Sequence, residues 1–274
     1  MPETNQATEM DSLKQRLKST WSAGDFGQIA KSYQRGAASF ISELGIKPGQ
    51  KVLDVACGNG NLSFPAAQTG AVVTGVDIAP NLILQAKQRA ENEGLNITFE
   101  EGDAERLPCS DASFEIAVSM FGAMFAPRPE LVVSELLRVT SPGGTIAMAN
   151  WTKESFIGEM FKTIAGFVPP PAIMSSPLLW GDEAIIRERF KEAKHISTKR
   201  QSITFEFDMP PEEVVSFWRE YYGPTQRAFA ALDGDSTKQE DLYKALSNLW
   251  KRANRALGNT TTVDSQYLRV LVSR

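Results

Sequence analysis

The sequence predicts an α/β fold built on a doubly wound, mostly parallel β-sheet. Three observations support this fold class. Short apolar runs alternate with amphipathic segments, the first apolar run ends in a turn that contains two glycines, and the 274 residues suit one large domain. Because a parallel strand pair needs a long crossover, usually a helix, this alternation favours parallel over antiparallel pairing.

Five strands are expected in the first half of the chain, each formed by a short apolar run. These runs cover residues 51–55, 72–76, 97–100, 114–120 and 145–149. Apolar residues at helical spacing predict the helices between them, at residues 61–69, 81–92 and 130–139. The segment Pro142-Gly143-Gly144 is expected to end the last of these helices and to turn the chain into the fifth strand.

Both flanks of this region are expected to add helices. Residues 12–44 follow a helical pattern before the first strand. After Trp151 the regular alternation is lost, and two helices are expected within 155–190, around three consecutive prolines. Further elements are predicted as a strand at 196–207, helices at 210–222, 225–232 and 238–257, and a final strand at 266–272.

Composition and charge exclude several function classes. Lys and Arg number 29 against 33 Asp and Glu, and this net charge of −4 argues against a nucleic-acid partner. No apolar run is long enough to predict membrane insertion, and the polar start lacks a secretory signal pattern. Cys57 and Cys109 offer neither a disulfide framework nor a metal-ligand cluster, so no metal is expected and a cytoplasmic setting is the default.

The strongest motif is the turn that follows the first strand. There Cys57-Gly58-Asn59-Gly60 leads directly into a helix. Without a Cβ, glycine lets backbone N–H groups and a helix N-terminus come close to a bound ligand. An ordinary turn between a strand and a helix would also account for two glycines, so the motif needs support from its context.

Acidic residues after the next two strands supply that support. Asp77 ends the second strand about 20 residues after Gly58, where a carboxylate can accept from both ribose hydroxyls of an adenosine. Ile78 offers an apolar surface to the adenine ring. After the third strand, Asp103 can accept from the adenine amino group while the Ala104 N–H donates to the ring. Three successive strands therefore direct adenosine-binding groups to one crevice.

This set of motifs resembles the class I S-adenosylmethionine-dependent methyltransferases, in particular their ubiquinone/menaquinone C-methyltransferase-like branch of small-molecule enzymes. The resemblance spans roughly residues 20–150. It implies a Rossmann-like sheet of seven strands with an antiparallel last strand, and S-adenosyl-L-methionine as cofactor. By resemblance, the cofactor-binding residues are Phe26, Tyr33, Asp54, Ala56, Cys57, Gly58, Gly60, Asp77, Ile78, Asp103, Ala104, Ser119, Met120 and Phe121.

Other interpretations remain at this point. Nicotinamide dehydrogenases share a glycine turn and an acidic residue, but Ser63 stands where their third glycine belongs. A non-catalytic or regulatory S-adenosylmethionine-binding protein would carry the same motifs. Ordinary helix packing accounts for Phe26 and Tyr33 equally well. No catalytic residue is predicted, because His195, the only histidine, stands at the start of a strand and away from the crevice.

The resemblance suggests a single methyltransferase domain over residues 1–274. Its expected parts are an N-terminal helical lid (1–45), a cofactor-binding core (46–151) and two helical cap segments (152–190 and 210–257). The predicted function is C- or O-methylation of a small, apolar or aromatic acceptor, and the sequence does not indicate an oligomeric state.

Aromatic residues are dense in the two cap segments, which are therefore expected to wall the acceptor pocket. Trp180 and Tyr222 are expected to face that pocket. Met124, Asn150 and Trp151 leave the fourth and fifth strands at the same edge, so they are expected close to it as well.

Overall fold

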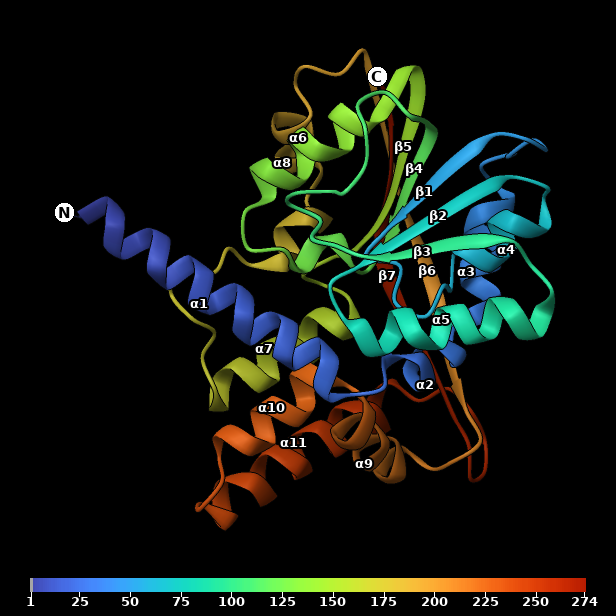
Figure 1. Ribbon diagram of the computed structural model, residues 1–274. Coiled ribbons are helices and arrows are strands. Elements are labelled where there is room, and N and C mark those ends of the chain that lie inside the picture. Colours follow the sequence, from blue (N-terminus) through green and yellow to red (C-terminus); the bar gives the residue numbers. More distant parts are fainter. Residues whose placement is uncertain (1) are drawn as a thin grey trace.

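A computed structural model describes the backbone of residues 2–274 and the side chains of residues 8–274. Its centre is a seven-stranded sheet in the order β3-β2-β1-β4-β5-β7-β6 (Figure 1). The strands are β1 (Lys51–Val55), β2 (Val72–Asp77), β3 (Ile97–Glu101), β4 (Phe114–Met120), β5 (Thr140–Trp151), β6 (His195–Phe207) and β7 (Thr261–Ser273). The predicted fold class is confirmed, and every predicted strand is present.

Strand direction follows the prediction. The first five strands pair in parallel, whereas β7 runs antiparallel to both β5 and β6. The register aligns Val55 with Val76, and Asp54 with Val118 on the next strand. The chain therefore leaves β1, β2 and β4 at one edge of the sheet, where all three strands end.

The predicted turn at Pro142-Gly143-Gly144 is wrong. Strand β5 already begins at Thr140 and runs through these residues. The irregularity lies in the pairing with β4, where Phe114 aligns with Thr140 but Ile116 aligns with Thr145. The proline and glycines therefore form a bulge inside the strand, because a bulge accommodates extra residues on one side of a strand pair.

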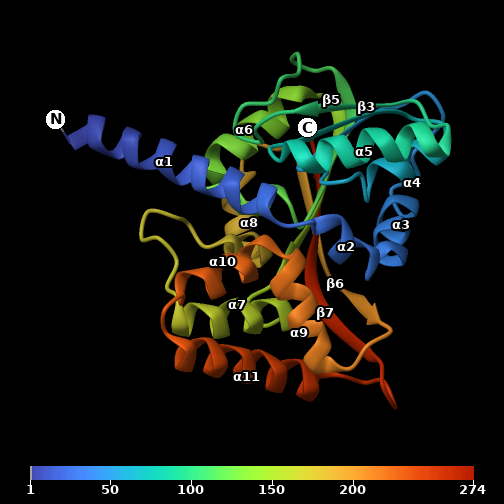
Figure 2. The ribbon, with the colours of Figure 1, turned by 60° about the horizontal axis from the view of Figure 1, so that its bottom comes forward.

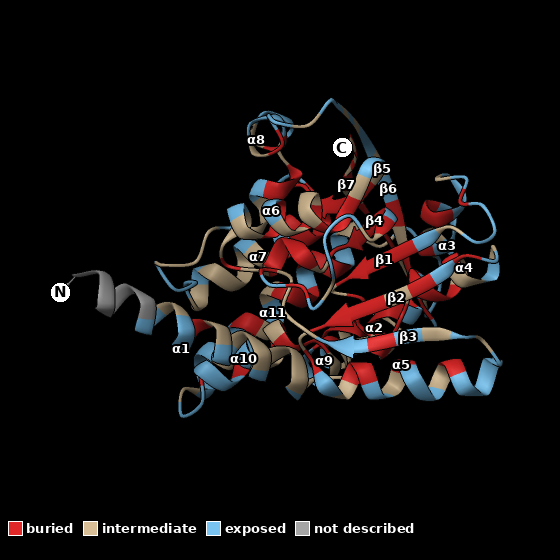
Figure 3. Cartoon of the chain, turned by 45° about the horizontal axis from the view of Figure 1, so that its top comes forward, coloured by how far each residue is buried: buried red, intermediate tan, exposed pale blue. Residues whose placement is uncertain are grey.

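Helices flank the sheet as expected. Helix α4 (Ser63–Gln68) packs on β2, α5 (Pro80–Glu93) packs on β2 and β3, and α6 (Pro129–Val139) packs on β4 and β5. Prolines at the first turns of α5 and α6 suit positions whose backbone N–H has no partner within the helix. Figure 3 shows that β1, β2 and β4 are largely buried, whereas the edge strand β3 is mostly exposed.

The N-terminal helical region consists of three helices. These are α1 (Pro2–Ala23), α2 (Phe26–Lys31) and α3 (Gln34–Ser42). The break falls at Gly24 and Asp25, where the Asp25 side chain accepts from Gly27 N and so begins α2. The later helices are α7 (Phe156–Phe167), η2 (Pro177–Gly181), α8 (Glu183–Arg189), α9 (Pro211–Tyr221), α10 (Gly223–Ala231) and α11 (Ser236–Ala253).

Helix α1 packs against helices from the far end of the sequence. Figures 1 and 2 show its C-terminal half lying between the sheet and the group formed by α7, α9, α10 and α11. At Gly223 the two segments meet backbone to backbone, since a Cβ there would lie 2.2 Å from the carbonyl oxygen of Thr20. The first residue of α10 therefore has to be glycine for α1 to approach this closely.

Within residues 2–274, no helix combines the length and the apolar character that crossing a membrane requires.

Candidate functional site

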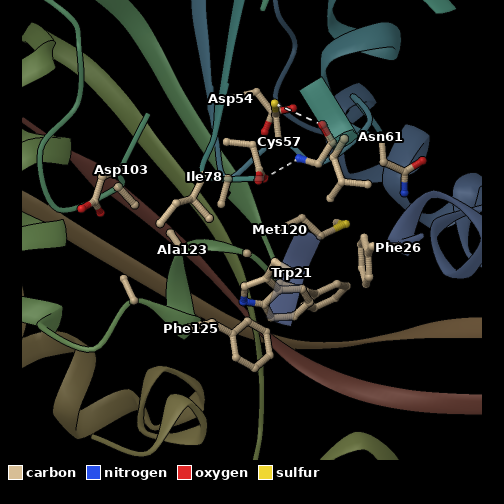
Figure 4. Close-up of a pocket in the computed structure, with 18 of the residues that line it drawn as sticks. Trp21, Phe26, Asp54, Cys57, Asn61, Ile78, Asp103, Met120, Ala123 and Phe125 are labelled. Atoms are coloured by element: carbon tan, nitrogen blue, oxygen red, sulfur yellow. Dashed lines mark hydrogen bonds between the residues drawn. The ribbon is translucent and has the colours of Figure 1, made fainter. Parts of the chain in front are cut away.

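A pocket opens where β1, β2, β3 and β4 end (Figure 4). The space between its lining atoms is about 1010 Å³, a volume that includes open solvent at the mouth. The residues that line it are Lys14, Leu17, Trp21, Phe26, Tyr33, Asp54, Ala56, Cys57, Gly58, Asn59, Asn61, Leu62, Asp77, Ile78, Leu82, Gly102, Asp103, Ala104, Met120, Phe121, Gly122, Ala123, Phe125, Ala126 and Pro127.

The glycine turn forms one wall of the pocket and is held by Asp77. Gly58 has a φ of +56°, a left-handed conformation that favours glycine, and its N–H donates to Asp77 Oδ2 over 2.8 Å. Asp77 Oδ1 accepts from Ala79 N, also over 2.8 Å. The residue is only 7% exposed. Asp77 is therefore a structural brace for the turn as well as a pocket residue.

Asp54 supplies a second buried carboxyl group beside the turn. Its Oδ2 accepts from Ser63 Oγ over 2.6 Å. Burial raises the pKa of Asp54 to about 7, and the nearby negative charge of Asp77 acts in the same direction. Burial raises the pKa of Asp77 too. This part of the pocket therefore favours a ligand that brings positive charge.

An ion-pair network closes the opposite end. Lys14 of α1 pairs with Asp103 and also donates to Glu105 Oε2 over 2.8 Å. The Glu105 side chain is fully buried and accepts from the backbone N, Nε and Nη2 of Arg128 at 2.8, 2.7 and 2.6 Å. Lys18 pairs with Glu101 on the same side. Helix α1 is thus tied to the loops after β3 and β4.

Aromatic side chains form the remaining wall. Figure 4 shows Trp21, Phe26 and Phe125 gathered on one side of the pocket, with Asp54 and Cys57 on the other. The Trp21 ring lies 5.0 Å from Phe125, 6.0 Å from Phe26 and 5.9 Å from Tyr222, all with an edge directed toward a face. The pocket therefore has a polar side and an apolar aromatic side.

Tyr33 and Phe121 extend the aromatic wall inward. Their rings lie 5.9 Å apart, and Phe121 stacks on Trp151 at 3.4 Å. Phe121 adopts a φ of +56°, which is uncommon for a residue with a side chain. Burial raises the pKa of Tyr33, so its hydroxyl stays protonated and can donate a hydrogen bond.

Most residues expected at the cofactor site line this pocket, but Gly60 and Ser119 do not. Gly60 has a φ of +91°, and a Cβ there would lie 2.6 Å from the Phe64 ring, so this glycine allows close packing behind the turn. Ser119 Oγ accepts from Ala123 N over 3.1 Å. Both residues support the loops that form the pocket without reaching its surface.

The expectation for the cap segments is wrong. None of the residues that line the described pocket comes from 152–190 or 210–257. Trp180 is 1% exposed and packs against Phe190 and Arg189, whereas Tyr222 packs behind Trp21. Helix α1 lies between the sheet and the group formed by α7, α9, α10 and α11, whereas η2, which carries Trp180, packs on β5, β7 and η1.

Residues at the ends of β4 and β5 also lie elsewhere than expected. Met124, Asn150 and Trp151 are buried in the interior and do not line the pocket. Phe125 and Ala126, which follow Met124, line it instead. The short helix η1 (Ala123–Phe125) directs Met124 into the protein interior and Phe125 toward the pocket.

Sequence reasoning missed the pocket residues on α1, as well as Asn61 and Phe125. Lys14, Leu17 and Trp21 are spaced three and four residues apart, so they share one face of a helix. That spacing was visible in the sequence, but only the fold shows that this face meets the pocket. His195 is exposed at the start of β6, as predicted.

Comparisons with known proteins agree with this geometry. A family model described as a methyltransferase domain matches residues 52–144. An uncharacterized protein of Mycobacterium tuberculosis is 33% identical over 246 residues, which are 89% of this chain and 90% of that protein. A demethylmenaquinone methyltransferase of Renibacterium salmoninarum is 36% identical over 116 residues, 42% of this chain and 47% of that protein.

A solved structure shares the fold. Phosphoethanolamine N-methyltransferase 2 of Haemonchus contortus, in complex with S-adenosyl-L-methionine, superposes with a TM-score of 0.55 at 19% sequence identity. The match covers 87% of this chain and 52% of the other.

Proposed function

We propose that this chain, which belongs to the class I S-adenosylmethionine-dependent methyltransferases, methylates a small, apolar or aromatic acceptor. The enzyme uses S-adenosyl-L-methionine as its cofactor. The observation that carries the proposed acceptor class is the division of the pocket into a polar side and an aromatic side. The family match rules out the nicotinamide oxidoreductase interpretation.

The polar side fits the cofactor. Each Asp77 oxygen already accepts one backbone N–H, and a carboxylate oxygen can accept a second hydrogen bond, which leaves room for the two ribose hydroxyls. Ile78 and Ala104 line the pocket near Asp103, where the adenine ring would lie. The bound cofactor would supply a methyl group on a sulfonium sulfur. An electron pair of the acceptor forms the new bond to the methyl carbon, and the electrons of the broken carbon–sulfur bond stay on the sulfur.

The aromatic side fits the acceptor. Trp21 and Phe125 offer ring surface to the cavity and no ionisable group. Such a wall excludes water from the reaction and favours a flat or unsaturated hydrocarbon. The name of the Renibacterium relative, a demethylmenaquinone methyltransferase, is in line with an acceptor of this kind.

The side chains that line the pocket restrict how the acceptor loses its proton. Burial raises the pKa values of Cys57 and Tyr33, so neither forms an anion near neutral pH. The lining also contains no histidine. A phenol or an activated carbon, which has to lose a proton, would therefore find no base in Cys57, in Tyr33 or in a histidine of the described lining, and the contribution of the protein would be position and a dry environment.

Transfer of labelled methyl from S-adenosylmethionine to fractions of a lipid extract tests the proposed acceptor class. We expect label in an apolar, aromatic product, with formation of S-adenosylhomocysteine. Label found only in polar amines, or in protein or nucleic acid, would contradict the acceptor class while leaving the cofactor assignment intact.

Trp21→Ala is expected to reduce methyl transfer to that acceptor at least about tenfold, because truncating a large aromatic contact in a binding site commonly costs 1–2 kcal/mol or more. Affinity for S-adenosylhomocysteine should change less than about threefold. Phe217→Ala is the matched control, since Phe217 is an aromatic residue of α9 that does not line the pocket. If methyl transfer fell equally in the two variants, a role for Trp21 in acceptor binding would be contradicted.

Cofactor binding should depend on pH through Asp54. The free protein has a pKa of about 7 at this carboxyl, and a positively charged cofactor favours the ionised form and lowers that pKa. Binding is therefore coupled to loss of a proton. S-Adenosylmethionine affinity should be constant above pH 7 and fall, by at most about tenfold per pH unit, as the pH drops below 7.

Calorimetry between pH 5.5 and 8.5 measures this dependence. Asp54→Asn should bind more weakly at pH 8 and lose the dependence near pH 7. If Asp54→Asn kept the pH profile of the parent, the proton released on binding would come from another group. Asp77 is the next carboxyl group in the pocket.

A further inference from the structure

A long uncharged stretch of the chain lies at the protein surface. Between Lys162 and Asp182 the sequence has no acidic or basic residue, although 23% of the whole chain is charged. Most of the residues in between are apolar, yet every residue from 161 to 179 is at least partly exposed, and Leu179 is 38% exposed. A continuous apolar surface of this kind marks a site of interaction. Residues 163–181 form this apolar segment.

Both ends of the apolar segment adjoin the aromatic side of the pocket. Phe161, just before the segment, has its ring centre 5.9 Å from that of Phe125, which lines the pocket. At the other end, η2 packs on η1, the short helix that carries Phe125. Figure 2 shows the chain between α7 and α8 as a long loop at the periphery, on the same side of the molecule as α1. The segment therefore borders the side of the pocket proposed for the acceptor.

The chemistry of the segment favours a neutral lipid surface as its partner. Its three consecutive prolines have no backbone N–H, so fewer polar groups lose water when the loop enters lipid. Apart from Trp180, its only polar side chains are the hydroxyls of Thr163, Ser175 and Ser176. The segment has no cation and the chain has a net charge of −4, so anionic headgroups offer no attraction. Insertion would therefore depend on burial of apolar side chains.

We propose that the apolar segment docks the enzyme on a lipid surface, from which the acceptor reaches the aromatic side of the pocket past Phe161 and Phe125. The inference rests on the proposed function, because an apolar acceptor dissolves in lipid and is scarce in water. It adds the place where the enzyme collects that acceptor. Docking there brings the mouth of the pocket to the phase in which the acceptor is concentrated.

Flotation of the full chain with phosphatidylcholine vesicles, without cofactor or acceptor, tests the docking. The parent protein should float with the vesicles. The bound fraction should change less than about twofold when NaCl is raised to about 0.5 M, because salt screens charges but does not weaken apolar insertion. Vesicles that contain phosphatidylserine should bind the protein no better than phosphatidylcholine alone.

Met174→Asp combined with Leu179→Asp places two charges within the segment. This double variant should partition into the vesicles at least about tenfold more weakly, because a carboxylate has to lose its water on insertion. Its Kd for S-adenosylhomocysteine should stay within about twofold of the parent's, which shows that the variant is folded. The matched control is Leu84→Asp, at a leucine of α5 that is 57% exposed, and this control should partition like the parent.

Failure of the parent to float with phosphatidylcholine vesicles would overturn the proposal, and so would parent-like flotation of the double variant. Binding that needs anionic lipid and disappears in salt would overturn it as well. A dimeric parent and a monomeric double variant, neither of which floats, would assign the segment to a contact between two copies of the chain. If an enzyme that floats methylated only polar amines, the docking would stand and the proposed acceptor class would fail.

Discussion

Asp77→Asn is expected to weaken S-adenosylhomocysteine binding by about 100-fold or more. Hydrogen bonds to a charged group contribute about 1.5–3 kcal/mol each, and an ionised Asp77 would accept from two ribose hydroxyls. An asparagine in this place has one acceptor oxygen and presents an NH2 group where an acceptor is needed. The loss should be measured by calorimetry at pH 8, where a native carboxylate is most fully ionised.

The same substitution should lower stability. Both Asp77 oxygens accept from backbone N–H groups, at Gly58 and Ala79, and asparagine can satisfy only one of them. A buried N–H without a partner costs about 1–3 kcal/mol. The ribose role assigned from the sequence would leave the ligand-free protein unaffected, so a parent-like melting temperature would show that the turn does not need the carboxylate. Parent-like ligand affinity would show that Asp77 does not bind the ribose.

Glu105→Gln is expected to reduce the free energy of unfolding by about 2–4 kcal/mol, since removing one partner of a buried ion pair costs about 3–5 kcal/mol and glutamine keeps one acceptor. The Glu105 side chain is fully buried between Lys14 and the Arg128 guanidinium, so removal of its charge leaves Arg128 without a carboxylate partner and Lys14 with Asp103 alone. Thermal unfolding should show a decrease in Tm of about 5–10 °C.

The matched control is Glu101→Gln. This substitution removes the surface partner of Lys18, which lies on α1 like Lys14. The Glu101 side chain is 47% exposed, and surface pairs contribute about 0–1 kcal/mol. If both variants lost the same small amount of stability, Glu105 would not be the residue that fastens α1 to the loops after β3 and β4.

The sequence was sufficient to predict the sheet and the glycine turn that lines the pocket. Their signals are local: a buried strand, glycines that accept left-handed backbone angles, and Asp77 at the end of the next strand. Local signals do not distinguish a glycine that faces a ligand from one that faces the interior. The resemblance places Gly60 and Ser119 at the cofactor, whereas in the structure both support the pocket from behind its lining.

The aromatic side of the pocket could not be predicted, because it depends on contacts between distant segments. Trp21 follows a helical pattern that would suit any buried helix face. Its place in the pocket is set by Phe125 and Tyr222, which are about 100 and 200 residues later in the chain. Trp180 and Tyr222 are predicted at the pocket from aromatic content alone, which does not reveal that Tyr222 packs behind Trp21 of α1 and Trp180 packs against Phe190.

The backbone contact between Thr20 and Gly223 has a consequence for how the protein is made. A ribosome synthesises α1 first and α10 some 200 residues later, so a growing chain can complete strands β1 to β5 while α1 has the loops after β3 and β4, but not α10, to pack against. During that interval Trp21 lacks its contact with Tyr222, and the face of α1 that α10 later covers is available for aggregation or for a chaperone. The helix that carries Lys14, Leu17 and Trp21 to the pocket is covered on its far side only when the C-terminal helices have left the ribosome.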